Sequence, residues 1–336
     1  MSGSPNGGEA LDVLGLGNAL VDVLSPTPDE FLDRHGLVKG SMALIDAEQA
    51  TTLYDQMGPA TEKSGGSAAN TVVGVASLGG ASAFIGRVRD DTLGDVFAHD
   101  IRAAGVRFDT TPAVAGQPTG RCLILVTPDA ERTLNTFLGA AAELGVDDIT
   151  SSLIESAAVT YLEGYLFDQP DAKAAFRHAA AAAHQAGRQV ALSLSDTFCV
   201  ERHRNDFVAL VEHDVDLLFG NDGELCALYE VEGLPDALEL ARRHCPVAAI
   251  TLGADGSLVA TPDGVAEIPV HPVPGGVVDT TGAGDLYAAG FLYGYTHGHE
   301  PAGCGRLGAL AASEVISHLG ARPERSLAEL AASLAS

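Results

Sequence analysis

Short apolar runs alternate with segments of helical periodicity along most of the chain. Strand-like runs occupy residues 158–162, 189–194, 215–219 and 248–252, and stretches of helical spacing lie between them. Regular alternation of strands and helices is typical of a mostly parallel sheet flanked by helices. The pattern therefore predicts an α/β fold.

Two of the expected helices have recognisable ends. Asp46 is a candidate N-cap, Gln49 follows three residues later as in a capping box, and Gly58 lies just past the last turn. These signals predict a helix over residues 46–57. Residues 170–186 are rich in alanine, a strong helix former, and a glycine follows them directly.

Residues 19–45 and 107–137 do not follow the alternation of strands and helices. Both stretches carry short β-branched runs separated by Pro, Gly, Asp and Thr, without a long helix between them. We interpret them as antiparallel strands that meet in space as a small sheet. Such a sheet is expected to form a lid over the carboxyl ends of the parallel strands, where ligands bind in open α/β sheets.

The expected domain boundaries follow from the interpretation of these two stretches as a lid. Residues 1–10 are expected to be a flexible N-terminus. The main domain takes in residues 11–18, 46–106 and 138–336, and the lid takes in residues 19–45 and 107–137.

Charge narrows the range of partners. The chain has 19 basic and 45 acidic residues, a net charge of −26, so its field would repel a nucleic acid or an anionic membrane. An anionic substrate must therefore be held by local donors. The five cysteines form no CxxC pair, and no signal peptide or 18-residue apolar run is present, which favours a cytoplasmic protein.

The segment 279–292, DTTGAGDLYAAGFL, is a glycine-rich turn that runs directly into a helix. Gly282 and Gly284 would let backbone N–H groups face an anion at the positive end of the helix dipole. Asp285 beside such a nest would repel a phosphate unless it had a chemical task, and a general base is that task. The alternative is that Asp285 only caps the helix.

Two further clusters offer contacts for a small polar ligand. Gly65 and Gly66 would expose backbone donors, and Asn70 lies one helical turn further on, although close packing of a helix on the sheet explains them equally well. Near the start of the chain, Asn18 and Asp22 lie four residues apart. A carboxylate there could accept from two vicinal sugar hydroxyls, or it could be a turn residue.

Asn221 and Glu224 follow the apolar run 215–219. Oxygen ligands at the end of a buried strand suit a Mg²⁺ ion that keeps most of its waters, whereas capping of a helix by Asn221 with Glu224 at N3 is the alternative. The segment 251–257, TLGADGS, is a glycine turn that could approach a nucleotide or form only a hairpin.

Several enzyme classes lose support from missing motifs. The chain has no GxxxxGK[ST] of P-loop enzymes and no HRD or DFG of protein kinases. GLGNAL lacks the third glycine of the dinucleotide fingerprint, and GGSAA does not match the GxSxG nucleophile elbow.

The order of the motifs GGSAAN, IGRVRDDTLG, NDGE, TLGADG and DTTGAGDLYAAGFL resembles the ribokinase/PfkB family of carbohydrate and nucleoside kinases, from about residue 12 to about residue 322. The resemblance implies a three-layer α/β/α sandwich with a β-sheet lid, ATP and Mg²⁺ as cofactors, and a hydroxymethyl group on the acceptor. For the catalytic step, it implies a base at Asp285 and an anion hole at Gly282, Ala283 and Gly284. For ATP and magnesium, it implies nucleotide contacts at Asn221, Thr251, Gly253, Gly256 and Thr281, and magnesium association at Asn221 and Glu224. For the acceptor, it implies contacts at Asn18, Asp22, Gly65, Gly66 and Asn70.

Within the family, GNALVDV, LSLSDTF and LFGNDGE are most similar to the adenosine kinase branch. This likeness implies a lid arginine, Arg132, that closes toward the phosphates, and two candidates to stack on a purine, Phe167 and Phe198. Asp196 and Thr197 depart from the usual Ala-Pro of that branch, and Thr281 replaces its common Asn.

The expected reaction is therefore ATP-dependent phosphorylation of the 5′-hydroxyl of adenosine. A sugar kinase acting on ribose, fructose or a keto-deoxy sugar acid is the alternative, and a non-catalytic nucleoside sensor is a third hypothesis. The expected molecule is a monomer or homodimer, with a monovalent cation such as K⁺ as a further candidate cofactor.

Overall fold

The computed structural model describes residues 10–129 and 131–334. Its main sheet has eight strands, in the spatial order β13 (Gly264–Ile268), β12 (Ser257–Thr261), β11 (Val247–Thr251), β10 (Leu217–Asn221), β9 (Gln189–Ser193), β8 (Ala157–Glu163), β1 (Leu11–Leu16) and β5 (Ser82–Ile85). The strands from β11 to β5 are parallel, and β12 and β13 add an antiparallel edge. The α/β class expected from the sequence is confirmed.

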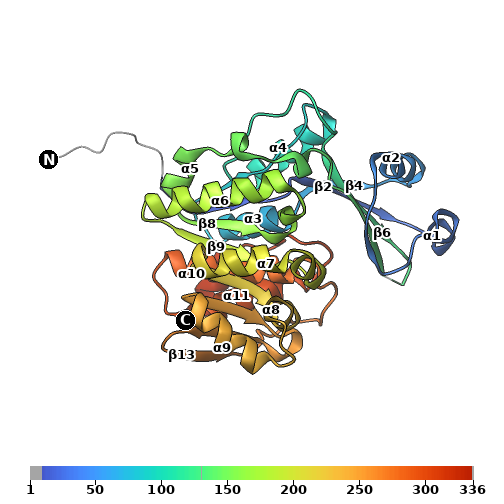
Figure 1. Ribbon diagram of the computed structural model, residues 1–336. Helices are drawn as coiled ribbons and strands as arrows, with labels where there is room; N and C mark the ends of the chain where they lie inside the picture. Colours follow the sequence, from blue (N-terminus) through green and yellow to red (C-terminus); the bar gives the residue numbers. More distant parts are fainter. Residues whose placement is uncertain (1–9, 130, 335–336) are drawn as a thin grey trace.

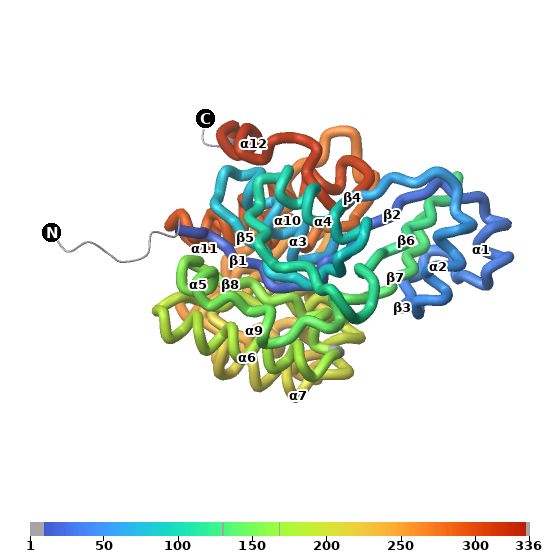
Figure 2. Tube along the Cα trace, turned by 90° about the horizontal axis from the view of Figure 1, so that it is seen from above, coloured from blue at the N-terminus to red at the C-terminus, as the bar shows by residue number. Residues whose placement is uncertain are grey.

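Helices cover both faces of this sheet. One face carries α3 (Ser67–Ser77), α4 (Thr92–Ala103), α10 (Ala283–Thr296), α11 (Pro301–Val315) and α12 (Leu327–Leu334). The other carries α5 (Ser151–Ser156), α6 (Pro170–Gln185), α7 (Thr197–His213), α8 (Asp222–Tyr229) and α9 (Leu234–His244). Figure 2 shows β1 and β8 between the two helical layers. The three-layer sandwich is therefore present.

Each layer has its own apolar core. Phe84, Phe97 and Phe108 pack together on the first face, with ring centroids 5.3 to 6.1 Å apart. On the second face, the small residues of α6 lie against the sheet, because its alanines repeat at helical spacing. Single turns of 3-10 helix complete the described chain, at Gly139–Glu143, Val146–Asp148, Gly164–Asp168 and Gly253–Asp255.

A second, five-stranded sheet projects from the main body, as Figure 1 shows, and we call it the lid. Its order is β3 (Met42–Leu44), β7 (Arg132–Phe137), β6 (Gly120–Val126), β2 (Leu20–Pro26) and β4 (Thr61–Gly65). The helices α1 (Asp29–His35) and α2 (Ala47–Gln56) accompany it (Figure 1). The two stretches singled out in the sequence thus meet in space as expected, because β2 pairs with β6.

The lid is a mixed sheet, which corrects the expectation of antiparallel strands. The β6–β7 and β2–β4 pairs are antiparallel, but the β2–β6 and β3–β7 pairs are parallel. A parallel pair needs a long connection, and residues 27–119 supply it between β2 and β6.

The lid boundaries also differ from those expected. β4 lies within residues 46–106, which the sequence pattern places in the main domain, and so does α2, which packs on β6 and β7. In contrast, Arg107 and Ala113 bridge to Ala83 and Arg89 beside the main sheet, so the second lid segment begins at Gly120. The helix α2 itself begins as predicted, with Asp46 and Gln49 in a capping box.

The arrangement brings chain segments that are far apart in sequence to one edge. The carboxyl ends of β9, β10 and β11 and the N-termini of α3 and α10 face the lid across a cavity. Within residues 10–129 and 131–334, no helix is both long enough and apolar enough to cross a membrane.

Candidate active site

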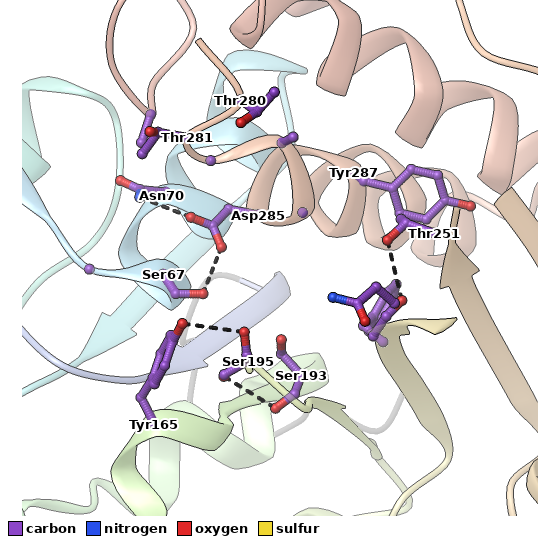
Figure 3. Close-up of a pocket in the computed structure, with 18 of the residues that line it drawn as sticks. Ser67, Asn70, Tyr165, Ser193, Ser195, Thr251, Thr280, Thr281, Asp285 and Tyr287 are labelled. Carbon is purple, nitrogen blue, oxygen red and sulfur yellow. Dashed lines mark hydrogen bonds between the residues drawn. The ribbon is translucent and has the colours of Figure 1, made fainter. Parts of the chain in front are cut away.

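The cavity between the lid and the main sheet has a volume of about 430 Å³. The residues predicted from the sequence that line it come from both halves of the chain: Asp22, Gly66, Asn70, Asn221, Glu224, Thr251, Thr281, Gly282, Ala283, Gly284 and Asp285. Figure 3 shows Ser67 and Asn70 directed at Asp285 from α3, with Thr280 and Thr281 in the turn before α10. The structure therefore gathers most of the predicted site in one place.

The turn before α10 is fixed by Asp279. Its Oδ1 atom accepts hydrogen bonds from the backbone N–H of Thr281 at 3.1 Å and from the Thr281 hydroxyl at 2.7 Å. Gly282 is the N-cap of α10 with φ +78°, and a Cβ atom there would lie 2.8 Å from Ala321, so only glycine fits. Gly284 has open space where a side chain would be. Backbone N–H groups at this end of α10 can therefore face an anion in the cavity.

Asp285 lies in the first turn of α10 and is held from α3. The Ser67 hydroxyl donates to Oδ1 at 2.6 Å, and the Asn70 amide donates to Oδ2 at 3.0 Å. Burial raises the pKa of Asp285 to about 6, although both hydrogen bonds favour the ionised form. The carboxylate is thus ionised at neutral pH and basic enough to accept a proton.

Asp22 reaches the cavity from β2. Burial raises its pKa to about 6, and the nearby Arg322 and Arg132 oppose the rise. A Cβ atom at Gly65 would lie 2.4 Å from this carboxylate, so Gly65 makes room for it without lining the cavity itself. At Gly66, with φ +101°, a Cβ atom would lie 2.1 Å from the carbonyl oxygen of Asn18.

The lid contributes a largely apolar wall. Asp22, Cys122 and Thr136 are directly paired across β2, β6 and β7, and Ile124 pairs with Leu134 one step further along. Because side chains alternate along a strand, these residues share one face of the lid, the face that lines the cavity. An apolar surface therefore stands beside a single carboxylate.

Asn18 does not line the cavity. It is buried, and its amide donates to Glu163 Oε1 at 2.6 Å, while Glu163 Oε2 accepts from the backbone N–H of Ala68 at 2.8 Å. Glu163 thereby joins the ends of β1 and β8 to the start of α3. Burial raises its pKa to about 7. The structure thus places Asn18 behind the cavity wall and not at an acceptor.

Asn221 and Glu224 form the capping box of α8. Asn221 Oδ1 accepts from the Glu224 N–H at 2.8 Å, and the two Glu224 oxygens accept from the Asn221 N–H at 3.0 Å and from its amide at 2.7 Å. Burial raises the pKa of Glu224 to about 7. The capping alternative is therefore present, and the same pair lines the cavity.

These oxygens fit a Mg²⁺ ion held through water. Both Glu224 oxygens already accept hydrogen bonds from Asn221, and no group of three His, Cys, Asp or Glu side chains in the described chain is arranged to hold a metal. Mg²⁺ typically keeps several waters and binds through one or two carboxylates together with substrate phosphates. This donor set suits that mode.

Arg132 extends from β7 to the turn before α10. Its Nη1 atom lies 2.7 Å from Asp279 Oδ2 and donates to the Thr281 hydroxyl at 3.1 Å. The side chain is 9% exposed, and its Nε and Nη2 atoms have no hydrogen-bond partner. It lines a second cavity, of about 320 Å³, that shares Asp22 and Asn70 with the first.

Gly253 and Gly256 line a third cavity, of about 500 Å³, and Thr251 borders both this cavity and the first. The segment 252–256 does join β11 and β12 as a hairpin. Valines 270, 273 and 277 and Ile316 make much of the wall apolar, and Ala283 and Gly284 connect this cavity to the N-terminus of α10. The segment therefore forms a hairpin and also lines a cavity.

Contrary to expectation, neither predicted aromatic residue lies in these cavities. Phe167 is 3% exposed and stacks on Phe207, with ring centroids 4.3 Å apart, so it is a core residue. Phe198 is 73% exposed in the first turn of α7, which its N-cap Asp196 begins. The aromatic side chains that do line the first cavity are Tyr165, Phe219 and Tyr287.

Sequence reasoning missed other lining residues. Ser67 lies inside the GGSAAN motif, three residues before Asn70, and this helical spacing is the signal that identifies it. Tyr165 follows β8, whereas Ser193 ends β9 and Ser195 follows it. Both serines lie within the LSLSDTF segment, from which only Phe198 is predicted as a site residue; Figure 3 shows Tyr165 bonded to Ser195.

Comparisons with known proteins agree with this geometry. Residues 37–326 match the model of the pfkB family of carbohydrate kinases. The chain is 30% identical to adenosine kinase 1 of Arabidopsis thaliana, over 92% of this chain and 94% of that protein. It is similar to the crystal structure of adenosine kinase from Sinorhizobium meliloti, with a TM-score of 0.89, 50% identity, and 97% and 99% of the two chains covered. It is also similar to a probable sugar kinase from Rhizobium etli CFN 42, with a TM-score of 0.90, 47% identity and the same coverage. The chain therefore belongs to the pfkB family of carbohydrate kinases, which are ATP-dependent phosphotransferases.

Proposed function

We propose that this kinase phosphorylates the 5′-hydroxyl of adenosine. The observation that carries the proposal is the lid face, where an apolar wall of Leu20, Ile124 and Leu134 adjoins one carboxylate, Asp22. A ribonucleoside has this same division, with a flat apolar base joined to a sugar with two vicinal hydroxyls. The similarity to adenosine kinases supports the same acceptor.

The residues then have separate tasks. Asp22 accepts hydrogen bonds from the ribose hydroxyls, and Asn70 and Gly66 lie beside them. Asp285 takes the proton of the 5′-hydroxyl, whose oxygen bonds to the γ-phosphorus as the bond to the β–γ bridging oxygen breaks and ADP leaves. The N–H groups from Gly282 to Gly284 face the negative charge on the transferred group.

The donor nucleotide fits the third cavity. Its apolar wall suits the adenine of ATP, and it opens at Ala283 and Gly284 onto the anion-binding turn. Asn221 and Glu224 would hold Mg²⁺ through water, and the ion would neutralise charge on the phosphates. Arg132 would exchange its ion pair with Asp279 for contact with the phosphoryl group.

A panel of acceptors tests the proposal. Purified protein with ATP and Mg²⁺ should convert adenosine to AMP, and 2′-deoxyadenosine should lose roughly 10- to 150-fold in kcat/KM, because Asp22 would lack one donor. Asp22→Ala should weaken both substrates and erase most of this difference. Asp285→Asn, which keeps the shape of the side chain, should bind adenosine but lower kcat by roughly 10²- to 10⁴-fold.

Other outcomes would contradict it. Phosphorylation of ribose or fructose, without turnover of either nucleoside, would support the sugar kinase suggested by the Rhizobium etli relative. Adenosine binding without turnover would support a sensor. Cytoplasmic location, K⁺ dependence and a monomeric or homodimeric state stay predictions.

A further inference from the structure

Arg322 lies beside the reacting groups, although it is 37 residues from Asp285 in sequence. It follows α11, and its side chain, 14% exposed, enters between α3 and α4. Its Nη1 atom bonds the Ser64 hydroxyl and lies 3.2 Å from Asp100 Oδ2, while its Nε atom donates to Asn70 Oδ1 at 3.2 Å. The guanidinium is therefore anchored on one side and bonded to a site residue on the other.

The bond to Asn70 decides which way that amide faces. A guanidinium has only donors, so the atom of Asn70 that faces Arg322 must be the oxygen. The NH₂ group is then directed at Asp285 Oδ2, to which it donates at 3.0 Å. With the amide reversed, Oδ1 would face the carboxylate and repel it.

Arg322 also acts through its charge. The negative charge of Asp285 raises the pKa of the titratable groups around it, which are Asp22 from β2, Tyr161 and Glu163 from β8, and Tyr165 after β8. The charged group that acts on Asp285 itself is Arg322. This cation lowers the pKa of both Asp285 and Asp22 against the effect of burial. Asp285 needs this help because the base must be ionised before it can accept a proton.

We propose that Arg322 is a positioning residue for the reaction: it orients the Asn70 amide toward Asp285 and keeps that base ionised. The inference rests on the proposed function for its kinetic consequence. It assigns to a residue outside every recognised motif a role in setting the pH range of the enzyme.

Two substitutions separate the two effects. Arg322→Met removes the charge and the hydrogen-bond donors but keeps an unbranched side chain. The pH below which kcat/KM falls, at the acid limb of the profile, should therefore rise by about one unit. This shift lowers kcat/KM roughly tenfold at pH 5 and changes it little at pH 8. Arg322→Lys keeps the charge, so its acid limb should stay near that of the wild type, while the lost Nε donor lowers kcat at all pH values. Arg325→Gln, an exposed arginine in the same segment, is the matched control and should change neither.

A second measurement does not need turnover. The chain has six asparagines, at positions 6, 18, 70, 135, 205 and 221, so ¹⁵N-asparagine labelling gives a simple side-chain amide spectrum. The Asn70 signal, assigned with Asn70→Ser, should shift as Asp285 gains its proton, with a midpoint near pH 6 in the wild type. In Arg322→Met the midpoint should rise, and in Arg322→Lys it should not.

The two readouts separate the possible failures. If no acceptor is phosphorylated, the proposed function fails, and the Asn70 titration still tests Arg322. If the wild type is active but neither the acid limb nor the Asn70 midpoint moves in Arg322→Met, the positioning role is wrong. A lower melting temperature with an unchanged pH profile would assign Arg322 to folding alone.

Discussion

Four carboxyl groups lie at or behind the wall of the first cavity, two of them buried and two partly buried, and their surroundings differ. Asp285 accepts from two side chains, Glu163 accepts from Asn18 and Ala68, and Glu224 accepts only from Asn221. Burial raises the pKa of every one of them, Asp22 included. Residue type alone therefore does not separate the proposed base, the proposed sugar and metal contacts, and the structural link; the partners of each carboxyl group do.

Glu224 offers a direct test, since it caps α8 and also lines the cavity. Glu224→Gln should raise the Mg²⁺ concentration needed for half-maximal activity several-fold, because a neutral amide holds the waters of a cation less strongly. The measurement is a Mg²⁺ titration of the rate at fixed ATP. Asp46→Ala, which breaks the similar capping box of α2 on the lid, is the control for lost capping. If both variants lose stability and neither shifts the Mg²⁺ midpoint, Glu224 is only a cap.

At the scale of elements, the sequence predicts what is local and misses what is not. The ends of α2 and α6 and the strands β8 to β11 follow from caps and apolar runs. The parallel β2–β6 pair does not, because its partners are distant in sequence and nothing local specifies their direction. Likewise, the DTTGAGD motif identifies Asp285 from the sequence, whereas Arg322 reaches the site only through tertiary packing. An aromatic residue such as Phe167 has a sequence context that is equally compatible with the core and with stacking on a purine.

The lid is joined to the catalytic turn by Arg132, which predicts how its loss affects the kinetics. Arg132→Ala should lower kcat by roughly 10²-fold and change the KM for adenosine little, if its charge acts on the phosphoryl group as we propose. Steady-state kinetics measure both parameters. Arg121→Ala is the control, because Arg121 lies on the same lid but bonds Thr51 and packs over Tyr54, outside the three cavities.

A change confined to KM would contradict the role of Arg132. Loss of its buried ion pair also leaves Asp279 without a cationic partner, so the melting temperature of Arg132→Ala should be measured alongside.

For the whole molecule, pH and stability are linked through the same carboxyl groups. A carboxyl whose pKa is higher in the folded state than in the unfolded state contributes stability at low pH, and this contribution is lost as pH rises through the folded value. The raised values of about 6 and 7 place the loss between about pH 4 and pH 7. Repulsion within a chain of net charge −26 acts in the same direction.

The free energy of unfolding without ligands should therefore be greater at pH 5.5 than at pH 7.5, by on the order of 2 kcal/mol. Urea denaturation at the two pH values measures it. Added NaCl should reduce only the part due to net charge. Equal stability at both pH values would show that these groups keep ordinary pKa values in the folded protein.

The β2–β6 pair also has a consequence for how the chain folds. It joins Leu20 to Gly120, residues 100 positions apart, and the intervening chain forms α1 to α4 and the strands β3, β4 and β5. Closing a loop of that length costs entropy before any contact repays it. The lid face that we propose receives the acceptor therefore cannot form until a ribosome has released more than a third of the protein.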